Sequence, residues 1–184
     1  MKRAVFVAFV VGTAVGIASG PPSVRPVPVP AADHHSTALE EVRGRYNNAQ
    51  LLLMDIGMRA GIVRPMWLTI GPCSDACVDI GEGSDTAYVM IDMRMLAAPP
   101  LVLEATLSHE VGHVAAGHIK KWKSQTTAAK DRFQDEADAY AMHLMGEPRY
   151  RQFLAVHDRD ADRVERTIAR LRLIPVNLPL TAGS

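Results

Sequence analysis

A short cluster of polar side chains inside an apolar helical pattern constrains this chain more than any other feature. Apolar residues recur at helical spacing over about 101–122, after a pair of prolines that suits a first helical turn, and this pattern predicts one helix. His109, Glu110 and His113 lie in its middle. Because helical residues four positions apart share one face, both imidazoles can bind the same metal ion, with Glu110 beside it.

The rest of the chain has the pattern of a small domain of class α+β. Its 184 residues suit one domain, and its formal net charge of zero gives no bias toward nucleic acid or an anionic membrane. Apolar periodicity predicts a mostly helical fold with two short strands that pair as a small antiparallel sheet. The expected helices cover residues 36–60, 101–122, 130–145, 148–157 and 159–172, and the expected strands cover 66–70 and 87–93, with a loop over 71–83.

The N-terminus has the layout of a targeting segment. Lys2 and Arg3 precede an uninterrupted apolar run over 4–18, and small residues follow, as in a secretory signal peptide. We therefore expect an exported protein, periplasmic or secreted, with no membrane contact beyond this segment. The expected divisions are a signal peptide over 1–20 (or an uncleaved anchor), a proline-rich linker over 21–35, the folded domain over 36–175 and a tail over 176–184.

The two cysteines of the chain lie close together in the expected loop. Cys73 and Cys77 enclose only three residues. In an oxidising compartment such a pair favours a local disulfide. A pair of metal ligands is the rival interpretation, but the sequence nearby offers no second pair of soft ligands. The sequence therefore favours a disulfide.

The helix expected over 130–145 is the natural source of a further metal ligand, because a catalytic zinc usually takes three protein ligands and keeps one position for water. The segment from His109 to His118, followed by Ala137 and Asp138, resembles the active-site motifs of the HtpX-like and CAAX-prenyl-protease-like zinc metalloendopeptidases of the gluzincin clan. The resemblance covers about residues 85–145. It implies a minimal zincin-type domain, Zn²⁺ as cofactor and a protein or peptide as substrate.

The third ligand position departs from that family. The family has a glutamate four residues before the aspartate, and this chain has Gln134 there. At about 100° per residue, Gln134 and Asp138 share the buried face of the helix, whereas Glu136 falls on the opposite side. Three interpretations stay open: Gln134 ligates weakly through its carbonyl oxygen, Asp138 moves from an outer position to the metal, or Glu136 ligates after a local register shift. A fourth is a degraded site, because a neutral amide brings no charge to the ion.

The resemblance assigns a role to each of the main residues. His109 and His113 would hold zinc, and Glu110 would act as the general base toward water and return the proton to the leaving amine. Asp138 would accept a hydrogen bond from a ligand histidine and fix its tautomer. The strand near 88–93 would align an extended peptide by edge pairing.

The leading functional prediction is a zinc-dependent endopeptidase that hydrolyses proteins of the cell envelope or outside the cell. The alternative is a catalytically weak or inactive peptidase-like binding protein, because of Gln134. We expect His118, five residues after His113, to point elsewhere on the helix, as a surface or outer-shell residue. The sequence does not indicate an oligomeric state.

Overall fold

The computed structural model of the chain describes residues 34–73, 76–80, 85–122 and 124–178. The expected signal peptide over 1–20 and nearly all of the expected linker lie outside these residues. The class is α+β, as predicted, with one small sheet. The elements are α1 (His34–Arg59), β1 (Met66–Ile70), β2 (Ala76–Ile80), β3 (Ala87–Ile91), the 3₁₀ helix η1 (Met93–Ala97), α2 (Pro100–Ala115), α3 (His118–Trp122), α4 (Thr127–Met145), α5 (Glu147–His157) and α6 (Ala161–Leu171).

The sheet is mixed, so the predicted antiparallel pairing of the two strands is wrong. Strand β3 lies in the centre, parallel to β1 and antiparallel to β2. The reason is β2 itself, which forms within the segment expected to be a loop. It reverses the chain between β1 and β3, so those two strands run in the same direction. Only five residues long and flanked by turn-forming residues, β2 gives little periodic signal.

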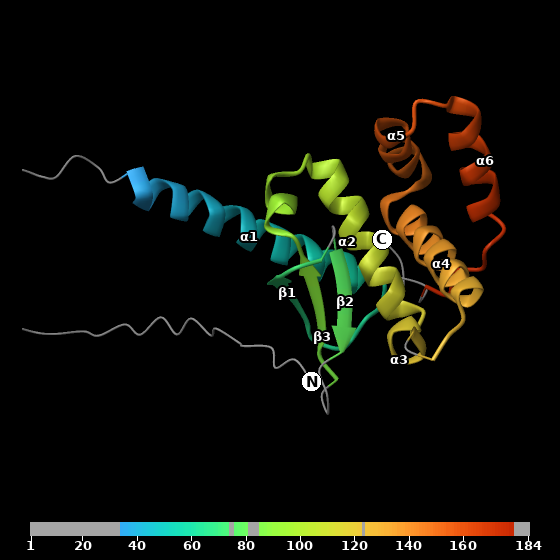
Figure 1. Ribbon diagram of the computed structural model, residues 1–184, viewed down its shortest axis with the longest axis horizontal. Coiled ribbons are helices and arrows are strands. Elements are labelled where there is room, and N and C mark those ends of the chain that lie inside the picture. Colours follow the sequence, from blue (N-terminus) through green and yellow to red (C-terminus); the bar gives the residue numbers. More distant parts are fainter. Residues whose placement is uncertain (1–33, 74–75, 81–84, 123, 179–184) are drawn as a thin grey trace, which may run out of the picture. The chain divides into compact units, whose positions relative to one another are not determined.

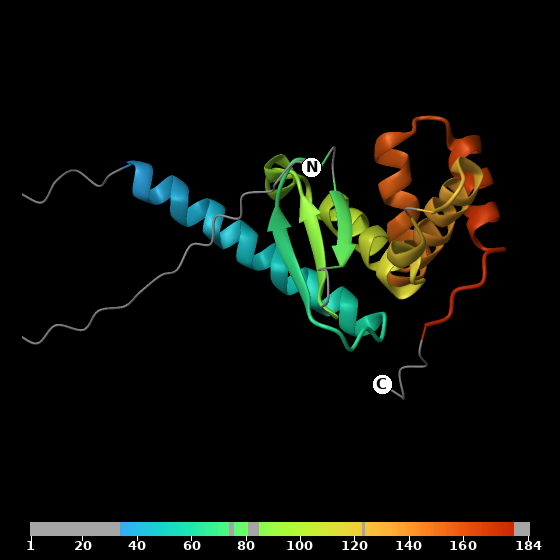
Figure 2. The ribbon, with the colours of Figure 1, turned by 60° about the horizontal axis from the view of Figure 1, so that its bottom comes forward.

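Helix α2 lies between two apolar cores, and Figure 1 shows it between the sheet and α4–α6. On one side it packs with α1 against the inner face of the sheet, through side chains no more than 1% exposed: Leu53, Ile56, Leu68, Val89, Leu107 and Val111. On the other side Ala105 packs with α4, α5 and α6, around Ala139, Tyr150 and Ile168. The N-terminal half of α1, exposed over residues 37–45, extends beyond the sheet (Figure 2). No helix among the described residues is long and apolar enough to cross a membrane.

The predicted helix over 101–122 is interrupted, which changes where His118 lies. The chain leaves α2 at Ala116 and turns at Gly117, whose φ of 68° suits a residue without a Cβ. The Gly117 amide donates to the Val114 carbonyl at 3.2 Å. His118 then begins α3 in a new direction, instead of continuing around the first helix.

Helices α2 and α4 approach each other closely at Gly112. A Cβ at this position would lie 2.8 Å from the Ala137 carbonyl oxygen, 3.0 Å from the Ala137 Cα and 2.9 Å from the Tyr140 Cβ. All three atoms belong to backbone or to the root of a side chain, so they cannot move without shifting α4. The absence of a side chain at Gly112 therefore sets the distance between the histidines of α2 and the polar residues of α4.

We expect Gly112→Ala to lower the free energy of unfolding by about 2 kcal/mol, the cost of overpacking a close contact, despite the better helix propensity of alanine. Urea denaturation measures the effect. Gly44→Ala is the matched control, because Gly44 is a glycine of α1 with nothing within 4 Å of its Cβ position, and alanine should stabilise the chain there by up to about 1 kcal/mol. A Gly112→Ala protein as stable as the wild type would contradict the tight helix contact.

Candidate functional site

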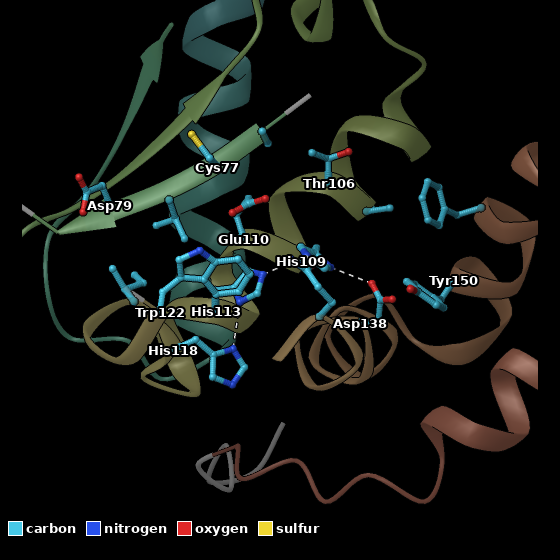
Figure 3. A pocket seen from close by; sticks show the side chains of 16 residues that line it. Cys77, Asp79, Thr106, His109, Glu110, His113, His118, Trp122, Asp138 and Tyr150 are labelled. Carbon is cyan, nitrogen blue, oxygen red and sulfur yellow. Dashed lines mark hydrogen bonds and ion pairs between the residues drawn. The ribbon is translucent and has the colours of Figure 1, made fainter. Parts of the chain in front are cut away.

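A cleft of about 630 Å³ opens beside α2 and contains every polar residue that the sequence singled out on that helix. Figure 3 shows its walls: β2 on one side, α3 below, and α4 and α5 on the other side. The lining side chains include His109, Glu110 and His113 from α2, His118 and Trp122 from α3, Gln134 and Asp138 from α4, and Tyr150 and Phe153 from α5.

Three atoms able to donate electron pairs to a metal converge in this cleft. The Nε2 atoms of His109 and His113 lie 3.1 Å apart, and Gln134 Oε1 lies 2.8 Å from His109 Nε2. The Gln134 side chain also lies near the His113 ring and opposes the lowering of the His113 pKa by burial. These contacts join α2 to α4, so residues 134 and 138 share one face of α4 as predicted. That face is not buried there as expected, because Gln134 is exposed and Asp138 half-buried.

The other nitrogen of His109 is held by an acidic residue. His109 Nδ1–H donates to Asp138 Oδ1 at 2.7 Å, because a carboxylate can only accept. Asp138 in turn accepts a hydrogen bond from the buried Tyr150 hydroxyl, and burial together with the Asp138 charge and this hydrogen bond raises the pKa of Tyr150. Asp138 thus fixes the ring orientation of His109 and directs its Nε2 into the cleft.

The other nitrogen of His113 faces a second histidine. His113 Nδ1 lies 2.9 Å from His118 Nδ1, and His118 Nε2–H donates to Glu136 Oε2 at 2.8 Å. His118 is 1% exposed. Burial lowers the pKa of His118, although Glu136 opposes the shift, so its ring is neutral near pH 7. Its Nδ1 is then an acceptor for the Nδ1–H of His113.

Protonation differs between the two histidines of α2. Burial alone would lower the pKa of His109, but the hydrogen bond and charge of Asp138 outweigh it and raise this pKa. Burial, with the positive charge of His109 second, lowers the pKa of His113 to about 3. Without a metal, therefore, a proton on His109 Nε2 satisfies the two acceptors that face it, His113 Nε2 and Gln134 Oε1.

The three converging atoms fit a metal ion. Nitrogen ligands at ~2.0–2.1 Å from a tetrahedral zinc ion stand ~3.3–3.4 Å apart, close to the 3.1 Å between the two Nε2 atoms. Each histidine carries a proton on Nδ1, the nitrogen away from these atoms, as ligand histidines do. The second proton of His109, on Nε2, would have to leave before a metal could bind. Among the residues that the structure describes, no group of three His, Cys, Asp or Glu side chains is arranged to hold a metal. The third donor here is an amide oxygen.

Glu110 has the properties of a proton acceptor that works near neutral pH. It is 7% exposed and lines the cleft, on the side of His109 that faces β2 (Figure 3). Burial raises its pKa to about 7, and the positive charge of His109 opposes this shift. A carboxylate with such a pKa can both take and return a proton at physiological pH.

The structure separates the three candidates for a third ligand. Gln134 and Asp138 both contact His109, but on opposite ring nitrogens, and only Gln134 is on the Nε2 side. Glu136 contacts His118 and Arg132 instead. Asp138 therefore lies behind His109 and contacts only the nitrogen of that ring that faces away from the converging atoms. The expectation that His118 points elsewhere on the helix is wrong, because the turn at Gly117 returns its ring to His113.

Two further features of the cleft differ from expectation. Strand β3 cannot align a peptide at its edge, because it pairs with β1 and β2 on both sides; β2 borders the cleft instead. Tyr150 has no signal in the sequence, since its role depends on how α5 packs against α4.

The predicted disulfide between Cys73 and Cys77 is confirmed, and it ties β2 to the segment after β1.

Comparisons with protein-family models, with curated proteins and with solved structures found no match for this chain.

Proposed function

We propose that this protein is an exported zinc-dependent endopeptidase. The observation that carries the proposal is the convergence of His109 Nε2, His113 Nε2 and Gln134 Oε1, with Glu110 buried beside them. Three electron-pair donors facing one another repel unless a cation or a proton lies between them. The zinc ligands would be His109, His113 and Gln134, and a zinc ion held there would act as a Lewis acid toward a carbonyl group and toward water.

Residues of the chain itself would transfer the proton, orient the ligands and exclude water. Glu110 would take the proton from the attacking water and deliver it to the leaving amine, which its pKa of about 7 permits in both directions. Asp138 would keep His109 oriented, and Tyr150 would hold Asp138 in turn. The apolar walls formed by Trp122 and Phe153 would exclude bulk water from the reacting groups.

Strand β2 supports a polypeptide as the substrate. It is the edge strand next to the cleft, and no other described strand pairs with its outer edge. An extended peptide can add to such an edge through main-chain hydrogen bonds, which orient it without reading its sequence. The Cys73–Cys77 disulfide tethers the start of this strand, and a disulfide fits a protein exported to the periplasm or beyond.

The proposal is tested by zinc content and hydrolysis together. We expect the purified exported protein to hold about one zinc per chain by mass spectrometry of metals, and to cleave an unfolded protein substrate. His113→Asn should lose both properties, because it removes one of the three donors. His143→Asn is the control, since His143 is an exposed histidine of α4 outside the cleft. A wild-type chain that binds no zinc would overturn the proposal.

The second candidate is a catalytically weak or inactive relative that binds polypeptides in the same cleft. Gln134 favours it, because the neutral amide gives the ion less charge than a carboxylate would. This candidate predicts peptide binding by a chain that lacks stoichiometric zinc. Equilibrium binding of an unfolded polypeptide, measured in the presence of a chelator, distinguishes it from the enzyme.

A further inference from the structure

His118 and Glu136 form a hydrogen-bonded pair that the proposed chemistry does not use; His118 is buried and Glu136 is partly exposed. The His118 ring stacks on Phe133, with centroids 4.2 Å apart and an interplanar angle of 12°. Its two nitrogens contact His113 Nδ1 at 2.9 Å and Glu136 Oε2 at 2.8 Å. Stacking and two hydrogen bonds leave this ring a single orientation, so it provides a fixed partner for His113.

The hydrogen-bond chain specifies where each proton lies. The Glu136 carboxylate accepts, so His118 must carry its proton on Nε2. A neutral His118 then presents the lone pair of Nδ1 to His113, which must carry its own proton on Nδ1. As a result, His113 Nε2 has no proton and faces His109 Nε2 and Gln134. One carboxylate thus determines the tautomer of a histidine two hydrogen bonds away.

We propose that His118 and Glu136 are positioning residues that hold His113 in the tautomer able to ligate a metal and that bring the charge of a carboxylate to that ligand. The inference rests on the proposed function insofar as it makes His113 a metal ligand. It assigns a matching support to each histidine of α2, since Asp138 holds His109 directly and Glu136 holds His113 through His118.

This arrangement offsets the missing charge at position 134. His109, His113 and Gln134 would all bind as neutral groups, so the donor atoms themselves carry no negative charge. A carboxylate behind a ligand histidine makes its ring a stronger donor. With Asp138 and Glu136 both in place, two negative charges lie behind the three neutral donors and balance a divalent ion. Glu136, which contacts His118 and not the proposed ligand atoms, would thus supply the negative charge that position 134 lacks.

Two substitutions at Glu136 separate its charge from its hydrogen bond. Glu136→Gln keeps an acceptor for His118 but removes the charge, whereas Glu136→Ala removes both. The control is Arg132→Ala, because Arg132 is the other ion-pair partner of Glu136, at 3.6 Å, and its side chain is 70% exposed. The Glu136 side chain is itself 32% exposed, so these variants should fold.

The tautomer of His113 is read from long-range ¹⁵N–¹H NMR spectra of the full chain with metal removed by a chelator. We expect the Nδ1–H form of His113 in the wild type, in Arg132→Ala and in Glu136→Gln, and a loss of this form in Glu136→Ala. Zinc affinity, measured by competition with a chelating dye, should fall by about 10-fold in Glu136→Gln and by up to about 100-fold in Glu136→Ala, and should not change in Arg132→Ala.

An Nε2–H form of His113 in the wild type, or a Glu136→Ala chain with an unchanged His113 tautomer, would overturn the positioning role. Equal zinc affinities of Glu136→Gln and the wild type would overturn the proposal that the negative charge of Glu136 strengthens His113 as a ligand. A wild-type chain that binds no zinc defeats the proposed function instead. The NMR comparison needs no metal, so it decides the positioning role in that case too.

Discussion

Glu110→Gln is expected to lower the rate of peptide hydrolysis by at least about 1,000-fold while leaving zinc bound. A positioned general base accelerates proton transfer by about 10²–10⁴-fold, and glutamine has no basic atom to replace it. The zinc content should not fall, because the three proposed ligand atoms belong to His109, His113 and Gln134. Glu104→Gln is the matched control, since Glu104 lies on the same helix outside the cleft and pairs with Arg149; it should keep the hydrolytic rate.

The same substitution has a second consequence in the metal-free chain. The pKa of Glu110 rises from 4.5 to about 7 on folding, because burial disfavours its charge. The folded state therefore binds more protons than the unfolded state between these two values, so stability falls as the pH rises through this window. Above pH 7 the buried charge costs on the order of 3 kcal/mol, at 1.36 kcal/mol per pKa unit. Glutamine stays neutral and avoids this cost.

Urea denaturation of the chelator-treated proteins at pH 4 and pH 8 measures this effect. We expect Glu110→Gln and the wild type to be about equally stable at pH 4, and the variant to be more stable at pH 8. Greater stability together with lost activity is what a buried catalytic carboxylate produces. A variant that is destabilised at pH 8, or one that still cleaves the substrate, would contradict the role of Glu110 as a buried base.

The sequence was sufficient to predict the residues that lie on one regular helix and the helix that faces them. His109, Glu110 and His113 share the cleft side of α2 because α2 is regular over Pro100–Ala115. The helical spacing of about 100° per residue also places Gln134 and Asp138 on one face, because α4 is unbroken from Thr127 to Met145. Local periodicity is enough in both cases, since backbone hydrogen bonds alone fix the angles between the side chains.

What the sequence did not predict depends on breaks and on tertiary packing. Gly117 follows two alanines that suit a helix, so the pattern favours continuing through it, yet its positive φ redirects His118 to His113. That glycine was the available signal, because helices often end at a glycine in this conformation. Tyr150 reaches Asp138 only through the packing of α5, for which no spacing rule exists. Strand β2 lies between segments rich in glycine, serine and aspartate, so its five residues could not be distinguished from a loop.

Gln134→Glu is expected to raise the zinc affinity by about 10- to 100-fold. Gln134 Oε1 already lies 2.8 Å from His109 Nε2, so a carboxylate oxygen can take the same place without moving α4. The substitution brings a full negative charge to the ion, and each factor of ten in affinity corresponds to about 1.4 kcal/mol. Competition with a chelating dye gives the affinity, and the rate of peptide hydrolysis is measured beside it.

The gain should depend on pH, because His109 must lose its extra proton before it can bind a metal. Asp138 raises the pKa of His109, and a glutamate at position 134 would raise it further by placing a second negative charge beside the ring. Protons therefore compete with zinc more strongly in the variant as the pH falls. The advantage of Gln134→Glu over the wild type should be largest at alkaline pH and should shrink toward acidic pH.

Two further variants decide whether position 134 supplies the third ligand. Asp138→Glu lengthens the carboxylate that now holds His109 Nδ1, so it should weaken zinc binding if Asp138 acts only through that ring. Gln134→Ala should weaken it as well, because only two donors then remain. If Gln134→Glu gives no gain and Gln134→Ala gives no loss, the amide does not face the metal. If Gln134→Glu instead raises the zinc affinity and Gln134→Ala lowers it, Gln134 is the third ligand. The chain then keeps a complete zinc site in which one ligand is neutral.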